Sequence, residues 1–320
     1  MRVLVTGMGG ELGTRVAQML EDRAEVDEVA GFDFMPPRRR LRRARFKRID
    51  PRDRDRIIGF VTDFAPHAVA HFGVYEPHSR MNPREAAAST EACTVNALGA
   101  AQRAGQLERI AVRSGLEVYG RGRGHPLVPD EEAPLAPTTP YGHTCLEVER
   151  LALGFGRRHD VKVGSLRYAV VAGSHIPSPL GRVLRLPAVP VPALADPAFS
   201  LLHQDDAARA MVEMLVRGLD GPLNVVGPGA TSPWQAVRLG GRIPIPVLGV
   251  GWDVAAEVAE LAGAPIPPHV AELLRHGRSG DGARAVAELE LGAMHPTQEV
   301  LVDLYEWATV IRLEPARRVA

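Results

Sequence analysis

The first 21 residues constrain the fold most strongly, because they combine a strand, a glycine-rich turn and a helix without a break. Arg2–Thr6 is a β-branched run typical of a buried strand, and apolar residues recur at helical spacing through Glu11–Glu21. Between these segments, Gly7, Gly10 and Gly13 stand three residues apart. They suit, in order, a tight turn, the close approach of a pyrophosphate to the backbone, and close packing of helix on sheet. The junction therefore predicts a dinucleotide site with the phosphates at the helix N-terminus.

Asp33 adds a second part to this site. It follows the apolar run 26–32, which is typical of a second strand, and lies about 20 residues beyond the last glycine. A carboxylate at this position accepts hydrogen bonds from both hydroxyls of the adenosine ribose. It also repels a 2′-phosphate, so the sequence favours NAD over NADP as the cofactor.

Strands and helices alternate through the first half of the chain. Further strands are expected at residues 68–72, 109–113 and 161–168, and helices at 54–60, 83–106 and 141–158. This alternation predicts an α/β fold of the Rossmann type, with a doubly wound parallel sheet.

The second half differs in composition and predicts a smaller, discontinuous substrate lobe. Two stretches rich in proline, glycine and apolar residues flank a helix at 205–218 and a strand at 223–226. We therefore assign 1–170, 200–227 and about 281–310 to the NAD-binding domain, 171–199 and 228–280 to the lobe, and 311–320 to a tail.

Composition narrows the class of partner. Lys+Arg and Asp+Glu each total 38, a balance that gives no indication of nucleic acid as a partner. The two cysteines are too few for a disulfide framework, and no run of about 18 apolar residues predicts a membrane span. Because the sequence opens on a strand, we expect no signal peptide. We expect a cytoplasmic protein that binds a small molecule. One run, Arg38 to Arg48, carries eight basic residues in eleven and is expected to form a solvated loop and helix face, or else a docking surface for an anionic partner.

The glycine spacing and several later motifs together resemble the extended short-chain dehydrogenase/reductases, the NAD-dependent epimerase/dehydratase family. The motifs occur in the family's order within residues 1–240. They are Val69-Ala-His-Phe-Gly-Val74, Val118-Tyr119-Gly120, Pro140-Tyr141-Gly142, Leu166-Arg167-Tyr168 and Leu202-His203-Gln204-Asp205-Asp206. The resemblance implies cofactor contacts from Gly7, Gly10, Glu11, Leu12, Gly13, Asp33, Asp50, Pro51, Phe72, Gly73, Asn96 and Tyr141.

The resemblance also assigns catalytic positions, and here the chain departs from the family. The family uses a Ser or Thr that holds the substrate oxygen, a Tyr that transfers the proton, and a Lys one helical turn later that lowers the pKa of the Tyr. Tyr141 matches the second position, but Cys145 stands where the Lys would be. Gly115 falls on the Ser/Thr position, and Ser114, one residue early, would point to the other face of a strand. His143 is a further candidate base, although a surface position fits it better.

Nucleotide-sugar recognition is also altered. UDP-galactose 4-epimerase-like members place an arginine four residues before the His203-like histidine, where this chain has Phe199. Other cations in or near the lobe could bind a diphosphate, although a solvated surface position fits each of them better: Arg182, Arg185, Arg275 and Arg278. His71 and His203 are read as structural, Glu147 and Glu149 as a solvated helix face, and no metal site is expected.

Two functions remain open at this point. The first is an NAD-dependent epimerase, dehydratase or oxidoreductase that acts on a sugar nucleotide or another hydroxyl or keto substrate. The second is an NAD-binding protein with a structural or sensing role, its catalysis lost with the Lys and the Ser/Thr. The resemblance further implies a homodimer formed by the helix that contains Asn96 and the helix that follows Tyr141.

Overall fold

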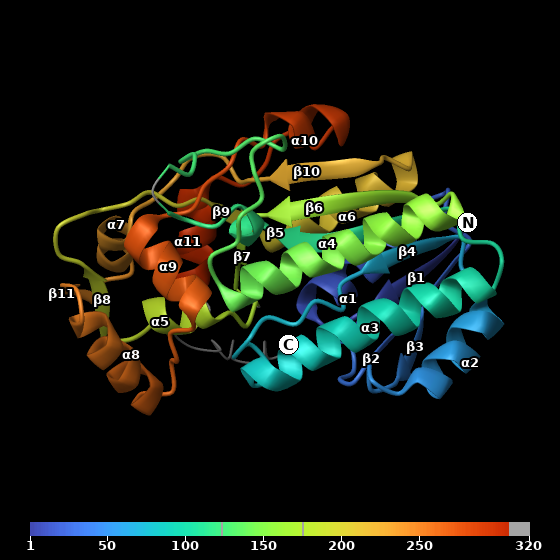
Figure 1. Ribbon diagram of the computed structural model, residues 1–320, viewed down its shortest axis with the longest axis horizontal. Coiled ribbons are helices and arrows are strands. Elements are labelled where there is room, and N and C mark those ends of the chain that lie inside the picture. The colour runs from blue at the N-terminus through green and yellow to red at the C-terminus, as the bar shows by residue number, and fades with distance from the viewer. Residues whose placement is uncertain (123, 175, 307–320) are drawn as a thin grey trace, which may run out of the picture.

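A seven-stranded parallel sheet forms the centre of the molecule in the computed structural model, which describes residues 1–122, 124–174 and 176–306 (Figure 1). Its strand order is β10-β6-β5-β4-β1-β2-β3, and every pair is parallel. The strands are β1 Arg2–Thr6, β2 Glu28–Asp33, β3 Arg45–Arg48, β4 Ala68–His71, β5 Arg109–Gly115, β6 Lys162–Tyr168 and β10 Gly221–Val225. The doubly wound Rossmann-type sheet predicted from the sequence is confirmed.

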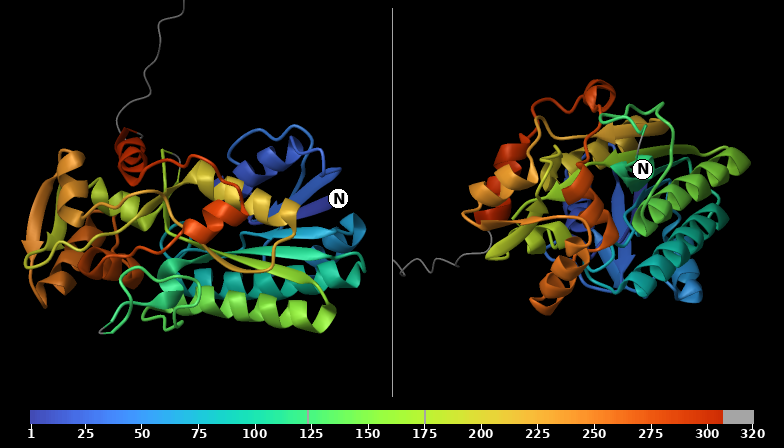
Figure 2. Two further views of the ribbon diagram at one scale, coloured as in Figure 1. Left: turned by 90° about the horizontal axis from the view of Figure 1, so that it is seen from above. Right: turned by 60° about the vertical axis from the view of Figure 1, so that its left-hand side comes forward.

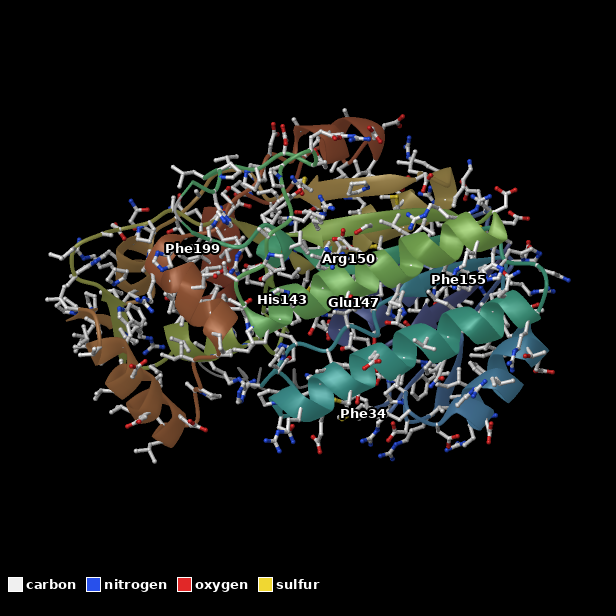
Figure 3. The ribbon with its side chains drawn as sticks, in the orientation of Figure 1. Phe34, His143, Glu147, Arg150, Phe155 and Phe199 are labelled. Carbon is white, nitrogen blue, oxygen red and sulfur yellow. The ribbon has the colours of Figure 1, made fainter. Side chains whose placement is uncertain are left out.

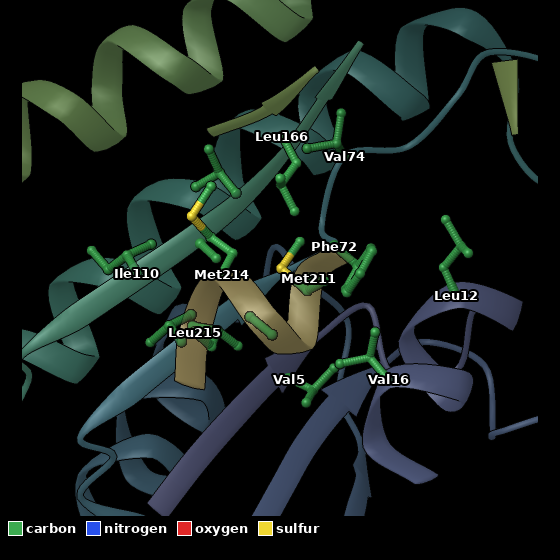
Figure 4. Packing of buried hydrophobic residues seen from close by; sticks show 14 of the residues in the cluster. Val5, Leu12, Val16, Phe72, Val74, Ile110, Leu166, Met211, Met214 and Leu215 are labelled. Carbon is green, nitrogen blue, oxygen red and sulfur yellow. The ribbon is translucent and has the colours of Figure 1, made fainter. Parts of the chain in front are cut away.

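Helices cover both faces of this sheet. On one face α2 Arg54–Phe64, α3 Pro83–Arg103 and α4 Pro140–His159 lie side by side, and on the other α1 Glu11–Glu21 packs beside α6 Gln204–Arg217. A short 3₁₀ helix, η1 Leu116–Tyr119, follows β5. Figure 4 shows Met211, Met214 and Leu215 of α6 packed over β-strand residues such as Ile110 and Leu166. This packing buries an apolar core on both sides of the sheet.

A second, smaller core lies at the carboxyl end of the sheet (Figure 2). Its elements are α5 Pro179–Leu184, β7 Val170–Ala172, β8 Ala188–Pro192, β9 Leu201–His203, α7 Pro233–Leu239, β11 Ile243–Val247, α8 Gly251–Leu261, α9 Pro268–His276 and α11 Thr297–Glu306. β8 pairs with β11 and β7 pairs with β9, as two small parallel sheets.

The segment expected to return to the NAD-binding domain near residues 281–310 divides between the two cores. α10 Ala283–Glu288 packs on β10 of the large sheet, whereas α11 packs on β9 and β7 and contributes Leu301 and Leu304 to the smaller core. The tail expected at 311–320 lies outside the described residues.

The basic run differs from its expected form. It contains no helix: a loop leads into the edge strand β3, where Arg45 lies over the ring of Phe64 and Lys47 over that of Phe60. Carboxylates of the first helix hold the loop, since Glu21 accepts backbone N–H groups and Glu11 accepts the side chain of Arg39 at 2.8 Å. All basic residues of the run except Arg39 are nonetheless exposed, so the run forms the solvated loop that the sequence predicts but not the helix face.

The expectation that Glu149 lies on a solvated helix face is wrong, because its carboxylate is buried. It lies 2.9 Å from the guanidinium of Arg167 on β6, and both side chains are at most 4% exposed. Arg167 also donates to the hydroxyl of Tyr119 at 2.9 Å. Glu147, two residues earlier on the same helix, is exposed as expected, and Figure 3 shows it on the outer face of α4.

Replacing Glu149 with Gln should lower the free energy of unfolding by about 3 to 5 kcal/mol, because Arg167 would keep a buried charge without its partner. The matched change Glu147→Gln should alter it by no more than about 0.5 kcal/mol. Denaturant unfolding of the two variants measures the difference. Equal midpoints would show that the Glu149–Arg167 pair contributes no net stability.

Candidate active site

One cleft opens at the carboxyl ends of the strands, where open parallel sheets bind their ligands. Its empty volume, including the mouth, is about 1060 Å³. The glycine turn, the end of β2, the loop after β4, the end of β5 and the start of α4 form one side of it, and α5 and α9 form the other. The two hydrophobic cores therefore meet at this cleft.

The glycine turn has the close contacts expected for a phosphate site. Gly7 has a φ of +66°, and a Cβ added to it would lie 2.7 Å from the carbonyl oxygen of Phe72. A Cβ on Gly13 would lie 2.3 Å from the carbonyl oxygen of Gly7, so only glycine allows α1 to pack this closely. Gly10 is the N-cap of α1 and carries no capping side chain. The first amides of the helix thus border the cleft without competition from a side chain.

Asp33 lies at the floor of the cleft with one oxygen unused. Its Oδ1 accepts the backbone N–H of Phe34 at 2.7 Å, whereas its buried Oδ2 has no hydrogen-bond partner among the described residues. Burial raises the pKa of this carboxyl to about 6, although the nearby charge of Arg80 acts in the opposite direction. A buried oxygen without a donor fits the ribose hydroxyl that the sequence predicts there.

Arg80 is a cleft residue that no sequence pattern marks, since it lies in the irregular loop after β4. Its Nη1 lies 3.7 Å from Oδ2 of Asp33, and its Nη2 donates to the carbonyl oxygen of Gly9 at 3.3 Å. The guanidinium therefore spans the interval between the ribose-binding acid and the glycine turn. In that position it supplies positive charge where a pyrophosphate would lie.

The other expected cofactor residues divide into two groups. Glu11, Leu12 and Phe72 line the cleft. The remaining ones do not line it in this conformation: Asp50 pairs with Arg52, the carbonyl oxygen of Pro51 accepts the Asn96 amide at 3.1 Å, and Gly73 packs against Cys93. Their contact with a cofactor stays a prediction.

Tyr141 lies at the start of α4 and faces the cleft beside a guanidinium. Nη2 of Arg113, on β5, lies 3.5 Å from the Tyr141 hydroxyl, and Nη1 donates to the carbonyl oxygen of Val74 at 3.3 Å. Burial raises the pKa of Tyr141 well above its usual value, and the charge of Arg113 opposes that rise. Cys145, one helical turn later on α4, is fully buried, and burial raises the pKa of its thiol.

The position of the family's Ser or Thr is filled from elsewhere in the chain. A Cβ added to Gly115 would lie only 2.1 Å from Oε2 of Glu117, so the Glu117 carboxylate occupies the space of the missing side chain. Ser114 lines the cleft, but its buried Oγ has no hydrogen-bond partner among the described residues. Both Ser114 and Gly115 border the cleft, and the expectation that the two positions face opposite sides of the strand stays a prediction.

Of the arginines considered for a diphosphate, Arg278 alone is among the residues that line the cleft. It is 2% exposed and pairs with Glu117 at 2.8 Å and with Glu272 at 2.6 Å. The others are held elsewhere: Arg182 donates to the His78 carbonyl oxygen, Arg185 donates to the Leu304 carbonyl oxygen, and Arg275 lies over the ring of Trp252. Phe199 is fully buried in the smaller core, away from the cleft lining.

A histidine from the lobe completes the wall opposite Tyr141. The His269 ring lies 4.8 Å from the Tyr141 ring, centroid to centroid, and its Nε2 is 3.1 Å from Oε1 of Glu76. His143, by contrast, is exposed on the outer face of α4 (Figure 3). No sequence spacing links His269 or Glu76 to Tyr141, because the three residues come from three distant segments.

Three residues outside the cleft lie at the spacing of metal ligands, a set that the sequence did not predict. Ligand atoms of His203, Asp206 and His295 all lie within 4.8 Å of one another. Protein donors already satisfy the carboxylate, since Asp206 accepts both the backbone and ring N–H groups of His295 and pairs with Arg209. The cluster therefore joins α6 to the loop before α11 through hydrogen bonds.

Comparison with known proteins agrees with this geometry. The family model of the NAD dependent epimerase/dehydratase family matches residues 3–227. The chain belongs to this family. An uncharacterised protein of Mycobacterium tuberculosis is 31% identical over 325 aligned residues, which cover 95% of this chain and 83% of that protein. UDP-glucose 4-epimerase of Azospirillum brasilense is 31% identical over 57% of this chain and 51% of its own length.

Solved structures show the same fold. UDP-glucuronic acid 4-epimerase from Bacillus cereus, in complex with UDP-glucuronic acid and NAD, superposes with a TM-score of 0.73 at 18% identity. The comparison covers 96% of this chain and 98% of that one. UDP-glucose 4-epimerase from Brucella ovis, in complex with NAD, gives a TM-score of 0.74 at 19% identity over 95% and 97% of the two chains. Among the described residues, no helix is both long and apolar enough to cross a membrane.

NAD is the cofactor of this family, and the cleft fits it. The unpartnered oxygen of Asp33 suits a ribose hydroxyl, and the bare turn at Gly7 and Gly10 suits a pyrophosphate. Arg80 adds a cation between these two places.

NAD should bind more tightly as the pH rises through about 6, the pKa of Asp33 in the free protein. Ribose hydroxyls donate to the charged carboxylate, so binding favours that form and releases a proton wherever Asp33 is still protonated. Calorimetry on both sides of this pH measures the effect, and Asp33→Asn should remove the dependence. An unchanged affinity across this range would exclude Asp33 as the ribose ligand.

The same carboxylate should set the preference for NAD over NADP. In the unmodified protein above pH 6, NAD should bind more tightly, because charged Asp33 repels a 2′-phosphate. Asp33→Ala should narrow the gap, since Arg80 would lose its acidic neighbour and become available to the phosphate. The double change Asp33→Ala with Arg80→Met should reverse that gain in NADP affinity.

Proposed function

We propose that this protein is an NAD-dependent enzyme of the epimerase/dehydratase type that acts on a carbon bearing a hydroxyl or keto group, in a sugar nucleotide or a related compound. One observation carries the proposal: Tyr141 lies in the same cleft as the glycine turn and Asp33. The relatives of this chain include proteins named as UDP-glucose 4-epimerases. They also include a dTDP-glucose 4,6-dehydratase of Streptomyces niveus, which is 28% identical over 82% of both chains.

The residues of the cleft divide the chemistry as follows. When bound, NAD supplies a hydride acceptor for the carbon that carries the reacting hydroxyl. Tyr141 takes the proton of that hydroxyl on its phenolic oxygen and returns it at the end of the cycle. Glu117 accepts a hydrogen bond from a substrate hydroxyl through Oε2, in the space that Gly115 leaves open. Arg278 holds the Glu117 carboxylate in place through the 2.8 Å contact between its Nη1 and Oε1 of Glu117.

A second function is favoured by the residues at the two altered positions. Cys145 cannot supply the charge of the family's lysine, and Gly115 cannot hydrogen-bond a substrate oxygen through a side chain. A protein that binds NAD in this cleft without turning over substrate would serve a structural or sensing role. Turnover separates the two functions, because both predict NAD binding.

Tyr141→Phe should reduce turnover by about 10²- to 10⁴-fold, because the variant lacks the group that accepts the proton. The assay incubates the NAD-loaded protein with a panel of UDP- and dTDP-sugars and measures epimerised or dehydrated product by chromatography. His143→Ala, an exposed change on the same helix, should leave the rate unchanged. Turnover that survives Tyr141→Phe would assign the chemistry to other residues, and NAD binding with no turnover of any compound would favour the second function.

We also propose that the protein is a homodimer through the outer face of α3 and α4. The two helices lie side by side on one face of the sheet (Figure 1), and Val95 of α3 is 55% exposed. One turn along, Gly99 has no atom within 4 Å of an added Cβ, so a partner helix could approach closely there.

Light scattering at micromolar concentration should therefore give the mass of a dimer. Val95→Arg should give a monomer, because it places a charge in the centre of the proposed interface. Val258→Arg is a matched control, since Val258 is 61% exposed on α8 in the lobe. A monomeric mass for the unmodified protein would refute the proposal.

A further inference from the structure

We propose that Arg113 takes over the electrostatic role of the lysine that α4 lacks, and stabilises the phenolate of Tyr141 from the strand side. This inference rests on the proposed function, in which Tyr141 accepts a proton. The Arg113 guanidinium reaches the Tyr141 hydroxyl across the gap between β5 and α4, with 3.5 Å between Nη2 and the phenolic oxygen. Arg113 contacts the reacting atom itself.

The backbone holds Arg113 in this place. Nη1 donates to the carbonyl oxygen of Val74 at 3.3 Å, in the loop that follows β4. One end of the planar guanidinium is thus bonded to the neighbouring loop, and the other end is directed at Tyr141. Both Val74 and Arg113 line the cleft, so the charge lies at its wall rather than on the outer surface.

The charge of Arg113 is available because the acids around Tyr141 have other partners. The charged or titratable groups that face Tyr141 are Arg113 on β5, Cys145 on α4, Glu76 in the loop after β4, Glu117 on η1 and His269 on α9. Glu76 contacts His269, and Glu117 pairs with Arg278. Within the described part of the chain, Arg113 forms no ion pair with a carboxylate, and its contacts are the Val74 carbonyl oxygen and the Tyr141 hydroxyl.

An unpaired guanidinium at this distance favours a negatively charged neighbour. Burial raises the pKa of Tyr141, because a phenolate in a dry site loses its hydration. Arg113 opposes this effect, and an adjacent positive charge typically lowers the pKa of an acid by about 1 to 3. Arginine keeps its own proton at any ordinary pH, so it acts as a fixed charge and does not relay protons.

The residues at the two altered family positions are compatible with this arrangement. Cys145 is fully buried one helical turn after Tyr141, and its short side chain carries no charge that would compete with the guanidinium of Arg113. Gly115 lies two residues after Arg113 on the same face of β5, and the carboxylate of Glu117 fills its side-chain space. The cation beside Tyr141 thus comes from β5 (Arg113) and not from α4, and the polar group beside the cleft comes from η1 (Glu117) and not from β5.

The proton balance of the reaction is simple in this arrangement. The form of Tyr141 that reacts is the phenolate beside Arg113, which takes the proton of the substrate hydroxyl as the carbon gives up its hydride to NAD. Tyr141 then becomes a neutral phenol, and Arg113 stays protonated throughout. On the return step the phenol gives the proton back as the hydride returns to the carbon, and the ion pair is restored.

The first test measures the charge on Tyr141 directly and needs no substrate. Tyrosine labelled with ¹³C at Cζ is incorporated, and the phenolate signal is followed by NMR as the pH is raised, with NAD present. Tyr141→Phe identifies the resonance of Tyr141. Arg113→Met should raise the pKa of Tyr141 by about 1 to 3 relative to the unmodified protein, and Arg113→Lys should raise it less, since it keeps the charge.

Arg182→Met is the matched control. Arg182 is also a half-buried arginine that donates to backbone carbonyl oxygens, those of His78 and Ser79, and it does not line the cleft. This change should leave the titration of Tyr141 unaltered. A pKa of Tyr141 that is the same in the unmodified protein, in Arg113→Lys and in Arg113→Met, with all three folded by circular dichroism, would overturn the inference.

The second test uses turnover and separates this inference from the proposed function. The alkaline-rising limb of the kcat profile should move to higher pH in Arg113→Met, and guanidinium added to Arg113→Ala should restore part of the rate at neutral pH. Turnover by the unmodified protein with neither effect would overturn the inference and leave the proposed function standing. No turnover, together with a pKa of Tyr141 that responds to Arg113, would refute the proposed function and leave the electrostatic role established.

Discussion

The close approach of α1 to the first strand determines where everything in the cleft lies. Gly13 packs so near the carbonyl oxygen of Gly7 that an added Cβ would lie at 2.3 Å, and a Cβ added to Gly7 would lie 2.7 Å from the carbonyl oxygen of Phe72 after β4. These contacts bring three backbone segments together at the carboxyl edge of the sheet. They direct the amides of the helix N-terminus into the cleft and set Asp33, at the end of β2, beside them. A side chain at Gly7 or Gly13 would separate the segments and with them the cofactor site.

Buried charge joins the two cores across this cleft. Arg278, which follows α9, pairs with Glu117 on the sheet side, and His269 of α9 contacts Glu76 in the loop after β4. Each pair links the lobe to the large sheet within the cleft wall. The Arg278–Glu117 pair is costly to break, because either partner alone would keep an uncompensated buried charge. Polar contacts as well as apolar packing therefore fix the position of the lobe relative to Tyr141.

Much of the fold could be predicted because it depends on local patterns. The alternation of apolar strands with periodic helices gave the parallel sheet, whereas β3 was missed because Arg45–Arg48 is a charged edge strand with a single apolar residue, Phe46. The site was predictable only where it follows helix or turn spacing, as for the glycines, Asp33 and Tyr141. Arg80, Arg113 and His269 reach the cleft from separate segments, and no spacing in one sequence shows that they meet. Glu149 was misread because helical position indicates a face but not the arginine on the adjacent strand that makes burial of an acid possible.

The position of the cation limits what it can do for catalysis. A lysine on α4, one turn after Tyr141, would hydrogen-bond the nicotinamide ribose and lower the pKa of the tyrosine with the same ammonium group. Arg113 approaches from β5, with Nη1 committed to the Val74 carbonyl oxygen and Nη2 facing the Tyr141 hydroxyl. Arg113 can therefore lower the pKa of Tyr141, but it has fewer N–H donors left for the nicotinamide ribose. A hydrogen bond to a charged group contributes about 1.5 to 3 kcal/mol, so we expect the nicotinamide end of a bound cofactor to be held less firmly than the adenosine end at Asp33. In this chain the two roles of one lysine are separated, and the electrostatic one is retained.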